Sequence, residues 1–179
     1  MVVFTSWFMK SSKTLPNLRE WILFGLLGAL TFAMKVTMAA LPNIEPVSLC
    51  ILVYGVVFGC KALYPTFVYV VLEILCFGLG TWNICYLYIW PILALAAIAL
   101  RDMRQPFGWA LVSGVYGLIF GALCGIVDIF IGGFAYAVAK WTSGIPFDIA
   151  HCIGNFCIAL VLFKPLRELL EKLYRRLNK

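Results

Sequence analysis

Charged side chains are scarce in this sequence. Only 12% of the 179 residues are Asp, Glu, Lys or Arg, against roughly a quarter in typical soluble domains. Hydrophobic residues make up 64% of the chain. This composition excludes an ordinary soluble domain and indicates an integral membrane protein of the all-α class.

Motifs for hydrolysis, ATP binding and metal binding are also missing. The sequence has no GxSxG, HExxH or P-loop motif, and its single histidine is His151. One histidine without a serine or cysteine at matching depth cannot form a nucleophile–base pair of the usual kind. Asp148 and His151 alone would supply only two of the three or four protein ligands that zinc requires. We therefore expect no enzymatic activity, no metal site and no cofactor in this chain, and any ATP hydrolysis would come from another polypeptide.

Metal-binding cysteine spacing is absent as well. The seven cysteines form no CxxC pair and all lie within apolar runs. Free cysteine is among the most buried residue types, so we expect small hydrophobic packing residues here, and neither disulfides nor zinc ligands.

Long apolar runs, in contrast, are abundant. A helix needs about 20 apolar residues to cross a bilayer, and six candidate spans are present: 20–41, 46–60, 62–80, 82–100, 108–127 and 145–163. The second would reach only about 22 Å at 1.5 Å per residue, so it must be little tilted, kinked or sheltered by other helices. After the fifth span, Gly132 and Gly133 predict a further turn or a surface helix.

Basic residues orient these six spans. With both termini in the cytoplasm, every Lys and Arg except Lys35 and Lys140 falls on the cytoplasmic side, as the positive-inside rule requires. The net charge of +6 is then explained by topology and by contact with anionic lipids of the bilayer. Nucleic acid is therefore not an expected partner.

Polar and aromatic residues collect at the expected outer ends of the spans. The first outer loop, LPNIEPVS, carries Asn43 and Glu45 between two prolines, which would hold it extended. The fourth span begins with Asn83 and with three aromatic residues spaced to lie on one helical face. These aromatic residues are Trp82, Tyr86 and Trp90.

The start of the sixth span, GIPFDIAHCIGN, is polar for a membrane segment. Pro146 suits the first turn of a helix, and Asp148, His151 and Asn155 follow on one face. Because polar groups at membrane depth usually face a cavity or each other, we predict an outward-opening substrate pocket.

Simpler interpretations exist for several of these residues. Tryptophan and tyrosine also gather at membrane interfaces as anchors, and Asp148 and His151 could pair with each other or with Lys140. For Glu73, in the third span, Lys35 is the only cation at comparable depth, so we predict a structural Lys35–Glu73 ion pair. Asp128 fits either a helix end or a pocket wall.

The chain accordingly divides into three segments. Residues 1–19 form a cytoplasmic N-terminal segment, with no cleavable signal peptide expected, and 20–163 form the six-helix transmembrane substrate-binding domain. In the tail 164–179, leucines recur at helical spacing opposite basic charges. This pattern predicts an amphipathic helix along the inner membrane surface.

Taken together, these features resemble the substrate-binding subunits (S components) of energy-coupling factor (ECF) vitamin transporters. The likeness covers nearly the whole chain, in size, span number, termini and polar outer ends. The sharpest local match is LLGALTFAMKV, in which Ala29 and Ala33 form a small-xxx-small pattern that permits close helix approach in lipid. The stretches LPNIEPVSL, YLYIW and GIPFDIAHCIGN are also similar to such subunits.

The resemblance implies high-affinity binding of a vitamin-like small molecule at the outer face of the cell membrane and its delivery inward. The implied partners are a transmembrane coupling subunit, which would dock on Ala29 and Ala33, and two ATPase subunits that hydrolyse ATP. The loop LPNIEPVS, with Asn43 and Glu45, would be the gate. The other residues implied to contact the ligand are Trp82, Asn83, Tyr86, Trp90, Asp148, His151 and Asn155. The pocket residues suit two substrate classes equally, a heteroaromatic vitamin and a corrinoid.

Three other functions compete with this one. A stand-alone small-molecule carrier is the nearest alternative, although no internal repeat is evident. A membrane enzyme acting on a lipid-linked substrate would need Asp148 or His151 for turnover. A scaffold would tolerate loss of His151 or Asn155 with no effect beyond stability.

Overall fold

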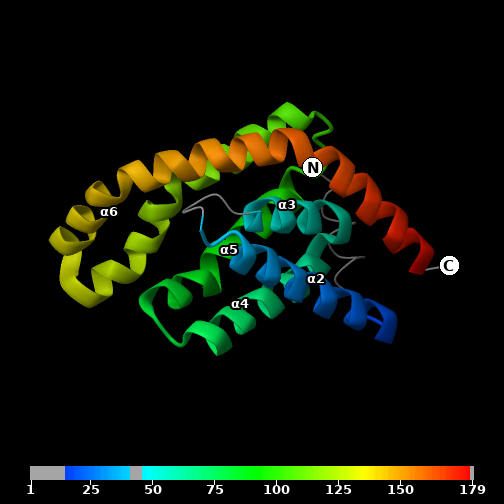
Figure 1. Ribbon diagram of the computed structural model, residues 1–179, viewed down its shortest axis with the longest axis horizontal. Helices are drawn as coiled ribbons and strands as arrows, with labels where there is room; N and C mark the ends of the chain where they lie inside the picture. Colours follow the sequence, from blue (N-terminus) through cyan, green and yellow to red (C-terminus); the bar gives the residue numbers. More distant parts are fainter. Residues whose placement is uncertain (1–14, 41–45, 178–179) are drawn as a thin grey trace.

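Helices account for every regular element that the structure describes. The computed structural model describes residues 15–40 and 46–177, shown in Figure 1. The elements are α2 (Leu18–Thr37), α3 (Val47–Phe58), the 3-10 helix η1 (Gly59–Ala62), α4 (Leu63–Phe77), α5 (Thr81–Ala99) and α6 (Pro106–Leu177). Within the described ranges, four helical stretches are long and apolar enough to cross a membrane: α2, Val47–Phe77, α5 and α6. The predicted all-α class is confirmed, and the helices fit a membrane-embedded protein.

Local chemistry explains several helix ends. Asn17 and Glu20 form a capping box at the start of α2, in which each side chain accepts from the other's backbone N–H. Glycines with positive φ follow α3 and α4, namely Gly59 at 60° and Gly78 at 81°. Glycine adopts this conformation without the Cβ clash of other residues, so each marks a natural helix stop.

Helix α2 has one buried and one exposed face. Phe24, Gly28 and Thr31 are buried on the inner face. A Cβ at Gly28 would lie 2.6 Å from the side chain of Val68 and 2.7 Å from the carbonyl of Pro65. Only glycine therefore lets α2 approach α4 this closely.

Helix α3 lies at the centre of the bundle. It has only 12 residues, and its buried side chains include Val47, Ile51, Leu52 and Val53. It packs against α2, α5 and α6. Of the three alternatives that the sequence left for the short second span, the structure shows that α3 is sheltered by its neighbours.

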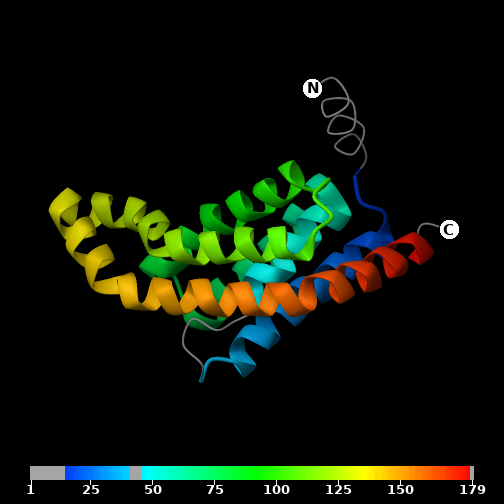
Figure 2. The same cartoon turned by 90° about the horizontal axis from the view of Figure 1, so that it is seen from above.

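Helix α6 folds into a U rather than a straight rod. The backbone leaves helical geometry at Gly133, with φ 82° and ψ 175°, which confirms the turn predicted from the glycine pair. We call 106–132 limb A, 134–144 the crosspiece and 145–177 limb B. Figures 1 and 2 show limb A running away from the bundle, the yellow crosspiece bending round, and limb B returning in orange and red.

The sequence predicted that Pro146 lies in the first turn of a helix, but the structure places it in the interior of one. Helical structure already starts in the crosspiece and continues through this proline. A proline inside a helix removes one backbone hydrogen bond and bends the axis. Just before it, the hydroxyls of Thr142 and Ser143 donate to the carbonyls of Ala139 and Lys140, so the weakened turn keeps additional hydrogen bonds.

Ion pairs join the helices at both ends of the bundle. Lys35 Nζ lies 2.7 Å from Glu73 Oε2, so the predicted Lys35–Glu73 pair is confirmed. At the opposite end, Lys61 Nζ lies 2.8 Å from Glu20 Oε1. Glu20 also accepts a hydrogen bond from the hydroxyl of Tyr174, which fixes the end of limb B against the start of α2.

Candidate functional site

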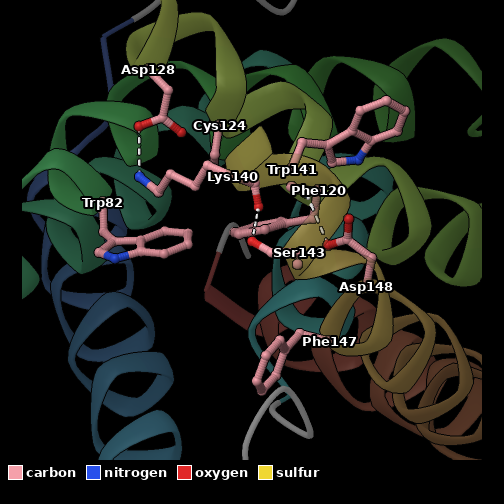
Figure 3. Close-up of a pocket in the computed structure, with 11 residues that line it drawn as sticks. Trp82, Phe120, Cys124, Asp128, Lys140, Trp141, Ser143, Phe147 and Asp148 are labelled. Atoms are coloured by element: carbon pink, nitrogen blue, oxygen red, sulfur yellow. Dashed lines mark hydrogen bonds and ion pairs between the residues drawn. The ribbon is translucent and has the colours of Figure 1, made fainter. Parts of the chain in front are cut away.

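The U of α6 encloses a cavity of about 400 Å³, which we call the α6 cavity. Limb A, the crosspiece, limb B and the first turn of α5 each supply part of its wall, as Figure 3 shows. The lining residues are Trp82, Phe120, Gly121, Cys124, Asp128, Lys140, Trp141, Ser143, Gly144, Phe147 and Asp148. Since Trp82 and Phe147 are more than half exposed, the rim of the cavity is open.

Glycines on limb A bring the two limbs of α6 close together. A Cβ at Gly117 would lie 2.8 Å from the backbone carbonyl of His151, and one at Gly121 would lie 2.5 Å from Oδ2 of Asp148. Small residues at such spacing allow close helix packing in apolar surroundings. The absence of a side chain at Gly121 is therefore what gives the Asp148 carboxylate its space.

Asp148 is the least satisfied polar group of the cavity. The backbone N–H of Gly121 donates to its Oδ1 at 3.0 Å. Its Oδ2 is buried and has no partner in hydrogen-bond geometry among the described residues, although Trp141 lies near enough to interact favourably with the carboxyl group. A buried oxygen without a proper donor is costly, and a ligand can supply the missing donor.

Lys140 and Asp128 form the second charged element. Lys140 Nζ lies 2.6 Å from Asp128 Oδ1, and also 5.3 Å from the centre of the Trp82 ring. The distance to the ring is within the range of a cation–π contact. Asp128 thus lies in the pocket wall, which resolves the alternative left open by the sequence, and Lys140 pairs with Asp128 instead of Asp148.

The sole histidine lies behind the cavity wall. His151 is 2% exposed, and its ring packs edge-on against Phe120 at 4.9 Å between centroids. Its Nε2 has no hydrogen-bond partner within the described part of the chain. Phe120 lines the cavity and His151 does not, so the structure places His151 as a neighbour of the wall and not as a lining residue.

Of the predicted aromatic face on α5, only Trp82 lines the cavity. Tyr86 and Trp90 are buried in an aromatic cluster and contact each other at 5.5 Å between ring centroids. Tyr86 also accepts a hydrogen bond from Lys35 Nζ at 3.3 Å. These two rings therefore build the core beside the cavity.

Both predicted asparagines on described helices make structural hydrogen bonds. The Asn83 amide donates to the carbonyl of Gly78, closing the turn before α5. The Asn155 amide donates to Ser48 Oγ at 3.0 Å and to the Ser113 carbonyl at 3.3 Å. Asn155 thereby ties α3 to both limbs of α6, and neither asparagine lines the α6 cavity.

The remaining predicted residues are the two of the gate, Asn43 and Glu45, and the two of the docking face, Ala29 and Ala33. Asn43 and Glu45 lie outside the described residues. Ala29 and Ala33 lie on the exposed face of α2, away from the buried face that meets α4. A Cβ at Gly25, one turn before Ala29, would meet nothing within 4 Å, so the small-residue surface extends over Gly25.

Several lining residues were missed from the sequence. Phe120, Cys124 and Phe147 looked like ordinary apolar positions, and Ser143 and Gly144 looked like loop residues. The spacing of Gly114, Gly117, Gly121 and Gly125 was the available indication, since it predicts a close partner for this face of limb A. The partner itself, limb B, follows only from the turn at Gly133.

No metal cluster accompanies the cavity. Among the described residues, no three His, Cys, Asp or Glu side chains are grouped closely enough to hold an ion. All seven cysteines lie in the described part of the chain and are free thiols. Cys50, Cys85 and Cys124 are buried as expected, whereas Cys76 and Cys157 are exposed.

Comparisons of the chain with models of known protein families, with curated proteins and with solved structures found no match.

Proposed function

We propose that this protein binds a vitamin-like small molecule in the α6 cavity and delivers it inward as the S component of an ATP-driven ECF importer. The observation that carries the proposal is the cavity itself. A space of about 400 Å³ falls in the size range of small-molecule sites. Its wall combines four aromatic side chains with two carboxylates and one ammonium group, which is the mixture that such sites use to hold and orient a ligand.

The proposed topology has six spans and both termini in the cytoplasm. In this arrangement limb A and limb B are the fifth and sixth spans, and the crosspiece lies at the outer surface. In this topology consecutive spans cross in alternating directions, so Lys61 and Tyr174 would fall at the inner end and Lys35 and Lys140 at the outer end. The α6 cavity then opens toward the outside, where a captured nutrient would arrive.

The docking part of the proposal rests on α2. Ala29 and Ala33 are exposed on this helix, and small side chains would let a partner helix approach the backbone closely. In lipid such packing contributes to association, because the hydrophobic effect gives no preference between helices and lipid tails. We assign this face to the transmembrane coupling subunit, to which two ATPase subunits would attach.

Affinity purification from the native membrane tests the importer assignment. The tagged full chain, solubilised in mild detergent, is expected to co-purify with one other multi-span protein and two ATPases, and ATP is expected to drive uptake by the reconstituted assembly. Ligand binding combined with turnover to a chemically altered product would instead identify an enzyme. Uptake by the chain alone, without ATPases, would identify a stand-alone carrier.

A further inference from the structure

The α6 cavity contains more negative than positive charge. Three ionisable side chains with carboxylate or ammonium groups line it: Asp128, Lys140 and Asp148. Lys140 and Asp128 compensate each other across 2.6 Å. Asp148 has no cation within ion-pair distance among the described residues, so the charge it carries when ionised is balanced by nothing in the wall.

Asp148 is also positioned to meet a ligand. The residue is 6% exposed, and one carboxylate oxygen is already held by the backbone N–H of Gly121. The other oxygen, Oδ2, is buried, and apart from the nearby Trp141 side chain it has no partner in hydrogen-bond geometry among the described residues. A buried charge left uncompensated is strongly unfavourable, whereas a bound cation with an N–H donor would satisfy both the charge and the hydrogen-bond need.

The aromatic residues of the wall favour the same kind of ligand. Figure 3 shows Trp82 and Asp148 on opposite sides of the cavity, with Phe147 at its lower edge. Lys140 lies over the Trp82 ring at 5.3 Å, so a ligand cation at this ring would compete with Lys140. Aromatic faces attract cations through the ring quadrupole and stack with flat rings.

We infer that the ligand of the α6 cavity is a flat organic cation, such as a protonated amine or amidine on an aromatic ring, whose positive group binds Asp148. This inference rests on the proposed binding function and narrows its substrate class. Ligands of similar shape should therefore bind with affinities that depend on their charge. Cations are favoured, neutral molecules bind more weakly, and anions are repelled by Asp148.

Three probes of nearly the same shape test this inference: benzamidinium, benzamide and benzoate, which are cationic, neutral and anionic at neutral pH. Each is titrated into the detergent-purified full chain, and binding is followed by tryptophan fluorescence and by the rise in melting temperature. Benzamidinium is expected to bind about tenfold more tightly than benzamide, or better, because hydrogen bonds to charged groups exceed neutral ones. Benzoate is expected to bind most weakly.

Variants then locate the charge preference. Asp148→Asn keeps the shape of the side chain and is expected to abolish the preference for benzamidinium over benzamide. Lys140→Gln removes the competing ammonium and is expected to strengthen benzamidinium binding. Asp102→Asn is the matched control, because Asp102 is exposed in the turn between α5 and α6 and is expected to leave all three affinities unchanged.

The outcomes separate the ligand class from the binding function. Equal binding of benzamide and benzamidinium, tighter binding of benzoate, no binding of benzamidinium, or a preference that survives in Asp148→Asn would each overturn the cation assignment. A neutral or anionic natural ligand recovered from the α6 cavity would also overturn it, while leaving the proposed binding function intact.

Discussion

Alanine substitutions at three glycines of limb A should have three different effects. Gly117, Gly121 and Gly125 lie on the same helix, about one turn apart, and each change adds the same methyl group. The surroundings of the added Cβ differ. It would meet nothing within 4 Å at Gly125, the Asp148 carboxylate at 2.5 Å at Gly121, and the backbone of His151 at 2.8 Å at Gly117.

The expected changes in unfolding free energy follow from these contacts. Gly125→Ala should stabilise by about 0.5–1 kcal/mol, since alanine loses less backbone entropy in a helix. In Gly121→Ala the same gain is opposed by loss of the hydrogen bond to Asp148, worth about 1.5–3 kcal/mol for a charged group, so the net loss is about 0.5–2.5 kcal/mol. In Gly117→Ala the clash is with backbone, which cannot rotate away, and the loss should approach about 3 kcal/mol.

Thermal unfolding in one detergent measures the series. For chains of 150–250 residues about 1 kcal/mol corresponds to roughly 2–4 °C, so Gly117→Ala should melt roughly 6–12 °C below the wild type on the same scale. Once the exposed thiols Cys76 and Cys157 have been blocked in the folded protein, reaction of the buried cysteines with a thiol-reactive fluorophore reports unfolding without a further mutation. Gly117→Ala melting as high as Gly125→Ala would refute the packing of limb A on limb B.

Two further predictions concern α2. Ala29→Trp combined with Ala33→Trp should abolish coupled uptake while ligand binding persists. Val115→Trp, at another exposed apolar position, is the control and should leave uptake unchanged. Uptake that survives in the double variant would exclude this docking face. Lys35→Met should destabilise by about 3–5 kcal/mol, because it leaves the buried Glu73 carboxylate uncompensated, and adding Glu73→Gln should recover much of that loss. Thermal melting of both single variants and the pair measures this coupling, and simple addition of the two single effects would contradict a direct ion pair.

Much of the helical framework could be predicted from composition and periodicity. Apolar runs locate helices because a bilayer-crossing backbone must satisfy its own hydrogen bonds. The Lys35–Glu73 pair was predictable for a related reason, since a carboxylate at that depth needs a cation and the sequence offers one. The turn at Gly133 followed from an adjacent glycine pair and from a run too long for one crossing.

The cavity wall was only partly predictable. Helical spacing grouped Trp82 with Tyr86 and Trp90, but it could not show that the last two are buried in the aromatic core, away from the cavity. His151 and Asn155 share a helical face with Asp148, yet Phe120 covers the first and Ser48 binds the second. Both covering residues are distant in sequence, so their contacts depend on tertiary packing that periodicity does not encode.

Mass spectrometry of the compound released from the heat-denatured, detergent-purified protein shows whether the α6 cavity holds a small molecule. Trp82→Ala, which removes a cavity wall, is compared with Trp21→Ala, a similarly exposed tryptophan (46% against 52%) outside the cavity. We expect one vitamin-like compound in the wild type and in Trp21→Ala, and its depletion in Trp82→Ala. Equal amounts in both variants, or no compound in any of the three proteins, would contradict binding of a small molecule in the α6 cavity.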